Sequence, residues 1–502
     1  MKNRLPQVPS SVRQAPFPEH RFFGRFRVER NQDCINCGTC IRMCPYGVHY
    51  RRDGWGKISR PRDWFCIGSE CQMNSFFCVN NCPVNALNVK DNPMFDSLGD
   101  YRWPPYLIVS NWKQSESGLP PVGGIESEAG ISGGGFDEIF IEFPEEPDSN
   151  VSPESVDLGV SLNRRNDGRD VEISVPFYGG GMSFGSIGIP IMLARARSSA
   201  AWNTFTCTGE GGYPDQLVPY KDYIITQIAT GLFGVREETI QRARVVEFKY
   251  AQGAKPGLGG HLLWDKNTPE VARMREAVAW SSLFSPFPFH SVYSVEDHKK
   301  HLDWIRSINP KALISVKVST PTDVDMVAVG SYYAGANIIH LDGGYGGTGA
   351  APEIAKKNIA MPIEYAIPRV HRFLRSEGIR DEVVLVASGG IRTAYDILKS
   401  IALGADAVAI GTSELVSVGC VRCGNCESGR GCPRGIATTD TDLSTLIPAD
   451  WGAQRIYNLF NSWVLQMRDA LSRLGLRSVR ELRGRTDLLS HAEHGKGVRE
   501  IE

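Results

Sequence analysis

The chain has 502 residues, of which 42% are hydrophobic and 22% are charged, and its formal net charge is -1. This composition is ordinary for a globular protein of two or three domains, and the charge gives no reason to expect nucleic acid or an anionic membrane as a partner. No uninterrupted apolar stretch approaches the ~18 residues of a membrane span, and the polar N-terminus lacks the apolar core of a secretion signal. We therefore predict a cytoplasmic protein without a membrane span.

The N-terminal region carries a first run of clustered cysteines. Cys34, Cys37, Cys40 and Cys44, followed by Pro45, have the C-x2-C-x2-C-x3-C-P spacing of bacterial ferredoxins. In that pattern three thiolates surround one face of a cubane, and the fourth reaches the other cluster of a pair. A disulfide framework is disfavoured in a large chain without a secretion signal. The run therefore predicts an iron-sulfur cluster with a second one nearby.

A second run follows and consists of Cys66, Cys71, Cys78 and Cys82, with Pro83 after it. The likeness of CPYGV to CPVNA supports an internal duplication. By ferredoxin logic, one cluster takes the first three cysteines of the first run plus Cys82, and the other takes the first three of the second run plus Cys44. Zinc remains the alternative, particularly for the second run with its wider spacing. We predict a small α+β ferredoxin-like domain over residues 1–92 with two 4Fe-4S clusters.

Residues 93–170 form the next segment and are rich in Gly, Pro, Ser and Asp. A structureless linker of that length is uncommon in a compact protein. We therefore expect a connector that packs on the following domain as ordered coil and brief strands, with the acids around Glu145 on the solvated surface. No catalytic role is predicted for it.

From Val171 onward, apolar runs of strand length alternate with helical patterns. Candidate strands lie in residues 173–180, 245–251, 312–318, 337–344, 382–390 and 407–413, and candidate helices in 324–336, 364–378 and 394–404. Continuous apolar strands covered by helices indicate a parallel sheet. Six or more such units fit a (β/α)8 TIM barrel, placed here at residues 171–490, better than an open sheet.

Glycine-rich loops follow the last two candidate strands. The residues concerned are Ser388, Gly389, Gly390, Arg392, Gly411 and Thr412. Loops after barrel strands seven and eight often form a phosphate site, in which glycine exposes backbone N–H groups. Tight turns need glycine for geometry alone, but two such loops beside a basic residue favour phosphate binding. We therefore predict FMN here.

A third run of cysteines lies just beyond the final strand. Cys420, Cys423, Cys426 and Cys432, followed by Pro433, have C-x2-C-x2-C-x5-C spacing, which is typical of a compact iron-sulfur cage. An electron carrier is thus expected beside the flavin.

Eight motifs now carry a family resemblance. They are SVPFYGGGMSFGSIG, CTGEGGYPDQ, QIATGLFGV, KYAQGAKPGLGG, SVYSVED, INPKALISVKV, GGTGAAP and GCVRCGNC with CPRGIAT. In this order they closely resemble the FMN-binding synthase domain of glutamate synthase. With the ferredoxin module, the chain resembles the archaeal-type large subunit.

The resemblance implies a reaction and the residues that perform it. Ammonia would add to 2-oxoglutarate, and the resulting 2-iminoglutarate would be reduced to glutamate through FMN. Motif position places Lys255 at the flavin, and places Ser183, Glu210, Lys249, Gln252 and Arg275 on the 2-oxoglutarate side. Arg and Lys pair with carboxylates, and Glu210 would handle protons or hold the incoming amine.

For two of these residues, a purely structural role remains an alternative. Glu210 could be a structural carboxylate that caps a glycine loop, and Arg275 could be an ordinary surface residue of a helix. Lys317 interrupts an apolar strand and is expected to face the flavin phosphate or ring. His340 and His301 receive no role.

Several positions depart from the family pattern. Leu258 and His261 replace a glutamate and a glutamine, and Cys207 replaces an asparagine, most simply as a small buried thiol. Phe287 and Phe289 make the mouth more apolar, whereas His290 and Tyr293 are kept. The alternatives are therefore an N-methylglutamate synthase-like enzyme acting on another amine or keto acid, and an electron-transfer subunit of a larger complex. An electron-transfer subunit that only passes electrons needs no residues to bind a dicarboxylate. The chain keeps such a set, which argues against this alternative: Glu210, Lys249, Gln252 and Arg275.

The resemblance also bears on the third cluster and on partners. Many members hold a 3Fe-4S cluster with three cysteines, which Cys420, Cys426 and Cys432 would match, while Cys423 makes 4Fe-4S chemistry possible. No glutaminase nucleophile stands at Met1-Lys2, and no convincing G-x-G-x-x-G motif follows a strand. We expect separate glutaminase or electron-donor subunits, or reduced ferredoxin, with a small-molecule keto acid as substrate and an oligomer or multisubunit complex.

Overall fold

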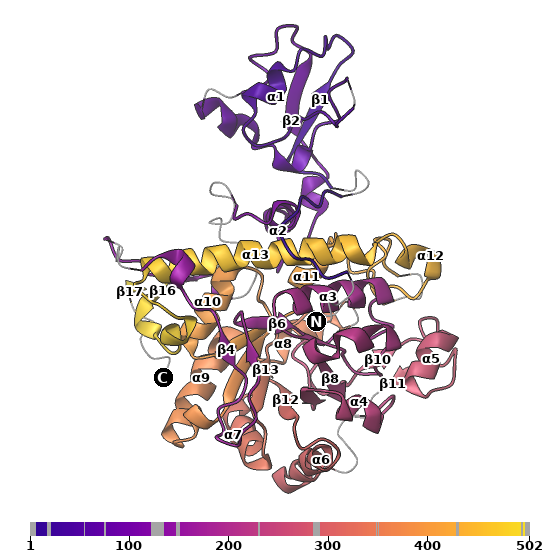
Figure 1. Cartoon of the computed structure of the whole chain (residues 1–502), viewed down its shortest axis with the longest axis vertical. Helices are drawn as coiled ribbons and strands as arrows, with labels where there is room; N and C mark the ends of the chain where they lie inside the picture. The colour runs from indigo at the N-terminus through magenta and orange to yellow at the C-terminus, as the bar shows by residue number, and fades with distance from the viewer. Residues whose placement is uncertain are drawn as a thin grey trace, which may run out of the picture.

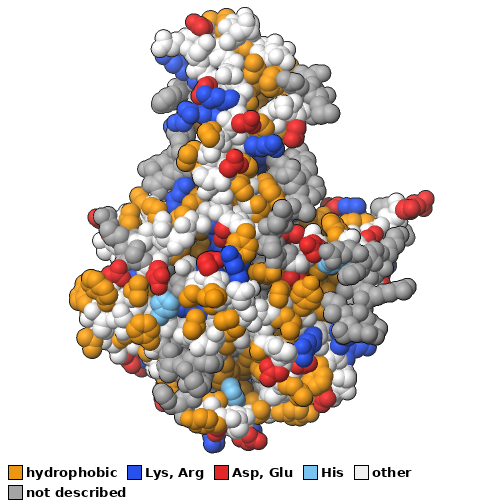
Figure 2. All heavy atoms as spheres, turned by 180° about the vertical axis from the view of Figure 1, so that it is seen from behind, with side chains coloured by type: hydrophobic (Ala, Val, Ile, Leu, Met, Phe, Trp, Pro, Cys, Tyr) orange, Lys and Arg blue, Asp and Glu red, His pale blue; other side chains and the backbone are white. Residues whose placement is uncertain are grey.

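The computed structural model describes residues 7–17, 22–54, 56–74, 77–121, 135–146, 151–228, 231–284, 292–347, 349, 351–427, 431–492 and 495–496. A small N-terminal unit stands on one side of the long helix α13 (Ala449–Arg473), and a large barrel lies on the other side (Figure 1). Among the described residues, no helix is both long and apolar enough to cross a membrane. Positive and negative side chains are interspersed over the face in Figure 2.

The N-terminal unit is built on an antiparallel pair of strands. Strand β1 (Phe26–Arg30) pairs with β2 (Leu87–Asp91), so that Val28 lies opposite Val89. The helical elements between them are α1 (Thr39–Met43), η1 (Asp63–Phe65) and η2 (Gly68–Asn74). The small core contains Val28 and Leu87 together with several cysteines. The unit thus has the expected α+β character, and the domain boundary at residue 92 stays a prediction.

The connector contains a helix that the sequence analysis did not predict. Helix α2 (Pro105–Ser117) packs against α13 and α11 (Thr412–Ser417). Proline is tolerated in the first turn, and Gly118 ends the helix with a φ of 73°. Because neighbours bury most sides of α2, its sequence lacks the polar face that marks a surface helix.

The other connector elements are short. They are η3 (Phe95–Ser97), η4 (Gly135–Asp137), β3 (Ile139–Ile141), η5 (Pro153–Ser155) and β4 (Val160–Ser161). Strand β3 pairs with β16 (Leu489–His491), which in turn pairs with β17 (Gly495–Lys496), and β4 pairs with β5 (Glu172–Ile173). These brief strands match the expectation for the connector. Glu145 is exposed, as expected.

Eight parallel strands form a closed barrel, which confirms the predicted (β/α)8 fold. They are β6 (Phe177–Gly179), β7 (Thr206–Cys207), β8 (Ile224–Ile228), β9 (Val245–Lys249), β12 (Leu313–Ser319), β13 (Ile338–Asp342), β14 (Val384–Ser388) and β15 (Ala407–Ile410). Six of them lie in predicted strand segments. Strands β7 and β8 were not predicted, and β7 has only two residues.

Helices surround the barrel (Figure 1). They are α3 (Ile189–Ala201), η6 (Asp215–Tyr223), α4 (Glu237–Gln241), α6 (Val295–Ile308), α7 (Val324–Ala334), α8 (Glu353–Asn358), α9 (Ile363–Ser376), η7 (Arg380–Glu382) and α10 (Ala394–Leu403). The remaining elements are β10 (His261–Leu262), α5 (Pro269–Arg275), β11 (Leu283–Phe284), α12 (Thr441–Ser444), η8 (Val479–Leu482) and η9 (Thr486–Leu488). Strand register sets Lys317 beside Lys249 and Asp342 beside Ser388, so polar residues gather at the carboxyl ends of the strands.

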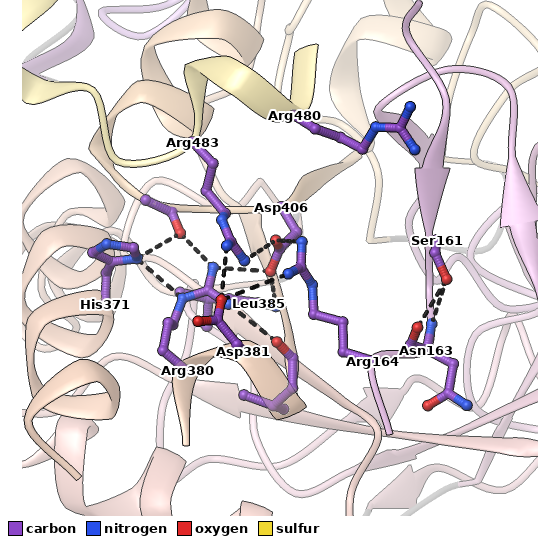
Figure 3. A network of polar contacts seen from close by, with 12 residues as sticks. Ser161, Asn163, Arg164, His371, Arg380, Asp381, Leu385, Asp406, Arg480 and Arg483 are labelled. Atoms are coloured by element: carbon purple, nitrogen blue, oxygen red, sulfur yellow. Dashed lines mark hydrogen bonds and ion pairs between the residues drawn. The ribbon is translucent and has the colours of Figure 1, made fainter. Parts of the chain in front are cut away.

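The amino end of the barrel is fastened by one buried carboxylate, that of Asp406 (Figure 3). Its oxygens lie 2.7 Å from Arg164 Nη2, 2.9 Å from Arg380 Nη2 and 3.3 Å from Arg483 Nη1. The backbone N–H of Leu385 donates a further hydrogen bond of 2.8 Å. Burial would raise the pKa of Asp406, but the three arginines outweigh that effect and hold the pKa below its ordinary value. The connector, the barrel and the C-terminal segment meet at this group.

Replacing Asp406 with asparagine should destabilise the barrel, because the buried guanidinium of Arg380 loses its ionic partner and those of Arg164 and Arg483 are left with the exposed Asp381. Breaking a buried ion pair typically costs ~3–5 kcal/mol, so thermal unfolding should shift down by several degrees. The exposed pair of Arg485 and Asp487 offers a control, since Asp487→Asn should cost less than ~1 kcal/mol. Equal unfolding temperatures for the two variants would contradict this role. Since the pKa is lowered, the stability supplied by Asp406 is present above the ordinary carboxyl pKa and is lost on acidification.

Candidate active site

Two adjoining cavities open at the carboxyl ends of the barrel strands. The first, here named the glycine cavity, has about 180 Å³ and is lined by the loops after β6, β13, β14 and β15. The second, the lysine cavity, has about 210 Å³ and is lined by Lys249, Lys255 and Lys266 among others. Both cavities share Gly181, Met182, Gln252, Gly347 and Leu415 in their walls. A molecule in one cavity can therefore touch a molecule in the other.

The glycine cavity gathers most of the residues predicted to bind phosphate. Its walls include Lys317, Ser388, Gly389, Gly390, Gly411 and Thr412. Gly389 and Gly390 have φ values of 97° and 95°, which L side chains rarely adopt. A Cβ on Gly389 would lie 2.7 Å from the backbone oxygen of Gly343. The loop thus brings bare backbone to the cavity, which suits a bound phosphate.

Arg392 is the exception among these residues, because it lies outside the walls of both cavities. Its guanidinium donates to both carboxylate oxygens of Asp137 and lies 3.5 Å from Asp396. It also donates to the backbone oxygen of Arg102 at 3.2 Å. The structure therefore does not support the prediction that Arg392 contacts the phosphate. Two carboxylates, one from the connector, turn the side chain away from the loop.

Lys317 contributes a side chain to the glycine cavity that is positively charged at neutral pH. Its Nζ lies 3.2 Å from Asp342 Oδ2, and Asp342 also accepts hydrogen bonds from Gly253 N at 2.9 Å and Ser388 Oγ at 2.6 Å. Burial would raise the pKa of Asp342, but Lys317 and the other partners lower it to about 2. Burial would lower the pKa of Lys317, but Asp342 and Glu247 raise it above its ordinary value. Both groups therefore stay charged at neutral pH.

His340 belongs to the same network, although the sequence analysis gave it no role. The side chain lines the glycine cavity, with Nε2 2.8 Å from Ser388 Oγ and Nδ1 2.8 Å from Glu247 Oε2. Glu247 also accepts a 2.6 Å hydrogen bond from Gln227. The sequence signal for this buried hydrogen-bonded network was a histidine and a glutamate within otherwise apolar strands. His301, by contrast, lies on α6 outside both cavities.

The lysine cavity gathers the residues expected on the 2-oxoglutarate side. Lys249 Nζ lies 3.0 Å from Glu210 Oε1, and both residues line the wall with Ser183 and Gln252. The second carboxylate oxygen of Glu210 is buried and has no hydrogen-bond partner among the residues that the structure describes. Burial would raise the pKa of Glu210, but Lys249 and Arg275 outweigh it and lower the pKa. Glu210 is therefore an anion with one oxygen free for a cationic or N–H ligand.

Arg275 lies directly behind this wall. It is 5% exposed, and its Nη2 donates to Ser183 Oγ and to the Phe184 backbone oxygen, both at 3.1 Å. Burial lowers the pKa of Arg275 to about 10, so it is still a cation at neutral pH. The alternative of an ordinary surface arginine is therefore wrong.

Lys255 lies in the lysine cavity and contacts His261, one of the residues that differ from the family pattern. Lys255 Nζ is 2.9 Å from His261 Nδ1, and His261 Nε2 is 2.8 Å from Glu427 Oε1. Burial and the neighbouring Lys249 lower the pKa of Lys255 to about 8. His261 thus joins a basic residue of the cavity to an acid that follows Cys426.

The other positions compared with the family pattern, both departures and kept residues, lie outside the two cavities or outside the described residues. Leu258 is 53% exposed and lines neither cavity, and Tyr293 is exposed. Cys207 is buried, and burial raises the pKa of its thiol to about 12, as expected for an inert thiol. Phe287, Phe289 and His290 lie outside the described residues.

The cysteine runs approach one another as groups. Burial raises the pKa of Cys78 to about 12, and the neighbouring thiols of Cys66, Cys44, Cys40 and Cys71 add to the rise. Cys40 and Cys44 of the first run are thus both near Cys78 of the second run, and the division of the thiols between two clusters stays a prediction. Within the described residues, no three potential ligands lie close enough to hold a single metal ion. Thiolates of a cubane bind different irons and stand farther apart than the ligands of one ion, so the grouping suits a cluster.

The third run borders the lysine cavity through Cys426. Burial raises the pKa of Cys420 to about 12, and the thiols of Cys426 and Cys432 contribute. Cys423 is exposed, whereas Cys432 is buried. Three thiols therefore converge beside the cavity, and the fourth is nearer to solvent.

The fold and the paired cavities define a TIM-barrel enzyme with a basic site at the carboxyl ends of its strands. The chain matches the family model described as "Conserved region in glutamate synthase" over residues 148–477. It is 36% identical over 480 residues to an archaeal-type glutamate synthase (NADPH) of Dehalococcoides mccartyi, covering 92% of this chain and 94% of that protein. The protein belongs to the glutamate synthase family.

Two further relatives extend this picture. An archaeal glutamate synthase (NADPH) of Methanocaldococcus jannaschii is 33% identical over 509 residues, which cover 95% of this chain and 96% of that protein. A ferredoxin-dependent glutamate synthase of Cyanidium caldarium is 36% identical over 267 residues, which cover 53% of this chain and 17% of that protein. The matches to the D. mccartyi and M. jannaschii proteins cover 92% and 95% of this chain, so they extend into the N-terminal unit. The protein is an FMN-dependent oxidoreductase of the glutamate synthase type.

Proposed function

We propose that the protein forms glutamate by reducing 2-iminoglutarate, made from 2-oxoglutarate and ammonia, at an FMN in the glycine cavity. The observation that carries this proposal is the wall shared by a cavity with glycine-rich loops and a cavity lined by Lys249, Lys255 and Lys266. FMN would supply the reducing electron pair. The chain's own residues would bind the keto acid, hold the amine and keep the two reactants in contact.

Several features of the glycine cavity support FMN as its ligand. Gly389 and Gly390 leave backbone accessible, Gly411 follows the last strand, and Lys317 places a fixed cation in the wall. A cation near the flavin favours an anionic reduced ring. We propose these residues, with Ser388 and Thr412, as the FMN site, and Lys255 as a second cation at the border of the lysine cavity.

The lysine cavity supplies complementary chemistry for a keto acid and ammonium. Lys249, Lys255 and the buried Arg275 provide positive charge for carboxylates, and Ser183 and Gln252 provide hydrogen bonds. Because Glu210 is anionic, it is suited to hold the ammonium or developing iminium group rather than to donate a proton. Of the two roles considered for Glu210, its free oxygen favours holding the incoming amine over handling protons.

The pH dependence of substrate binding should report Lys255. Below its pKa of about 8 the side chain is protonated and attracts a dicarboxylate, and it loses that charge as pH rises. The dissociation constant for 2-oxoglutarate should therefore increase as pH rises through 8. Flavin absorbance titrations at pH values on either side test this. Lys255→Met should remove the dependence, and a pH-independent wild type would refute the assignment.

We further propose two 4Fe-4S clusters in the N-terminal unit and one 3Fe-4S or 4Fe-4S cluster at Cys420 to Cys432. The grouping of thiols supports this, and Cys82 is assigned with the first run by ferredoxin logic alone. Iron, sulfide and flavin analysis of the purified chain should give ~11 or ~12 irons and about one FMN per chain. If the purified chain holds zinc in place of iron, or only about eight irons, then one or more of the three proposed clusters is absent.

Partners follow from the source of electrons and ammonia. The names of two relatives include NADPH, and that of a third includes ferredoxin. We propose that electrons come from a separate NADPH-oxidising subunit or from reduced ferredoxin, and that ammonia comes free or from a separate glutaminase. A cytoplasmic location and an oligomeric or multisubunit state stay predictions.

Product analysis tests the proposed substrate. Protein supplied with a low-potential reductant, 2-oxoglutarate and ammonium should form glutamate. Methylamine in place of ammonium should be a much poorer substrate, whereas an N-methylglutamate synthase-like enzyme would prefer it. The relatives favour ammonium over this alternative. Formation of N-methylglutamate at the higher rate would overturn the proposal.

A further inference from the structure

The connector contains a tight turn, Gly99–Trp103, that touches the active site. Asp100 and Trp103 exchange two backbone hydrogen bonds of 3.1 Å, and the Asp100 carboxylate accepts from the N–H groups of Arg102 and Trp103. Gly99 has a φ of 83°, and a Cβ there would lie 1.9 Å from the Trp103 backbone oxygen. The turn therefore has one compact shape, which we call the connector turn.

The connector turn is fixed to the barrel through Arg102. The Arg102 guanidinium donates to the Lys356 backbone oxygen at 3.0 Å and lies 5.0 Å from the centre of the Tyr345 ring, which lines the glycine cavity. Arg392 holds the Arg102 backbone oxygen from the other side. The residue expected to bind phosphate thus anchors the connector turn instead.

The same turn is fixed to the third cysteine run. Gly99 N donates to the Val421 backbone oxygen at 3.1 Å, and the Asp100 carboxylate accepts from Arg422 at 2.6 and 3.0 Å. Arg422 lies between Cys420 and Cys423. The connector turn therefore bridges the cysteine loop and the barrel loops of the glycine cavity.

The connector turn places Trp103 in the wall of the glycine cavity. It is 4% exposed and lines the glycine cavity. Among the described wall residues of that cavity, Trp103 alone precedes residue 148, where the match to the family model begins. The other described wall residues belong to the barrel, from Gly180 onward.

We propose that Trp103 is a flavin-contacting residue, so that the connector completes a cofactor site otherwise built by the barrel. This proposal rests on the FMN site proposed above. An indole in the wall buries flavin surface and excludes water, which strengthens binding. The third cysteine run and the flavin are then coupled, because one turn positions both the loop that carries this run and a wall of the flavin site.

A purely structural role for Trp103 is the competing interpretation, because it also packs in an aromatic cluster. That cluster contains Phe22, Trp64, Trp103 and Trp112. Trp64 offers a matched control: it is buried in the same cluster and donates to Glu116 at 3.0 Å, but does not line either cavity.

The experiment titrates FMN into full-length apoprotein and follows quenching of flavin fluorescence. Trp103→Ala should weaken FMN binding at least about tenfold, and Trp103→Phe by a smaller factor, while Trp64→Phe stays within about twofold of wild type. The absorption band of bound flavin should shift in the Trp103 variants alone. Circular dichroism identifies a variant that fails to fold, in which case Trp103→Phe decides.

The outcomes separate this proposal from the proposed function. Wild-type FMN affinity and spectrum in both Trp103 variants would overturn the contact, and so would equal weakening by Trp64→Phe and Trp103→Phe. Neither result would affect glutamate formation as the proposed reaction. A wild-type chain that binds FMN but forms no glutamate would instead refute the proposed function and leave the contact intact.

Discussion

Replacing Glu210 with glutamine should lower the turnover of 2-oxoglutarate and ammonium by about 10²–10³-fold while FMN stays bound. The substitution keeps the shape but removes the negative charge that pairs with Lys249 in the lysine cavity. The partnerless oxygen of Glu210 would be replaced by an amide that cannot attract ammonium as a carboxylate does. Steady-state glutamate formation and the KM for ammonium measure the loss.

A matched variant shows whether charge alone or position matters. Glu427 also lines the lysine cavity, but its carboxylate is half-exposed and is bonded to His261. Glu427→Gln should therefore reduce turnover much less than Glu210→Gln. If the two variants have equal activity, or Glu210→Gln matches wild type, Glu210 does not hold the amine.

Replacing Cys420 with serine should stop electrons from reaching the flavin from the N-terminal clusters. Cys420 is half-buried beside Cys426 and Cys432, and loss of one thiolate should remove about three or four irons. Flavin reduction by reduced ferredoxin should then fall to background. Rapid mixing with that donor, followed at the flavin absorbance, measures the effect.

Cys207 supplies the control for this experiment, since it is a buried thiol outside the three runs. Cys207→Ala should keep full iron content and normal flavin reduction. Cys423→Ser distinguishes the two cluster types, because a 3Fe-4S centre does not need this exposed thiol. Wild-type flavin reduction in Cys420→Ser would contradict the proposed route.

The barrel could be predicted because its longer strands have a clear sequence pattern. Residues 312–318 and 382–390 are apolar runs bounded by turns, and they became β12 and β14. Strand β7, with two residues, gives no pattern of its own and exists because its neighbours pair with it. Helix α2 was missed because burial by α13 and α11 replaced its polar face.

The site could be predicted where chemistry is local in sequence. Gly389 and Gly390 act through their own backbone, so their position after a strand was enough. Arg392 lies outside both cavities because carboxylates distant in sequence or one helical turn away decide where a long side chain points. Likewise, the contact of His261 with Glu427 joins residues 166 apart, and no spacing rule could reveal it.

The central claim is that electrons stored on this chain pass through its flavin to an imine of 2-oxoglutarate. Its most direct test mixes the anaerobically reduced protein with 2-oxoglutarate and ammonium and follows the flavin absorbance during a single turnover. The flavin should reoxidise only when both substrates are present, and glutamate should form in step with reoxidation. A flavin that stays reduced with ammonium and with methylamine would contradict the account.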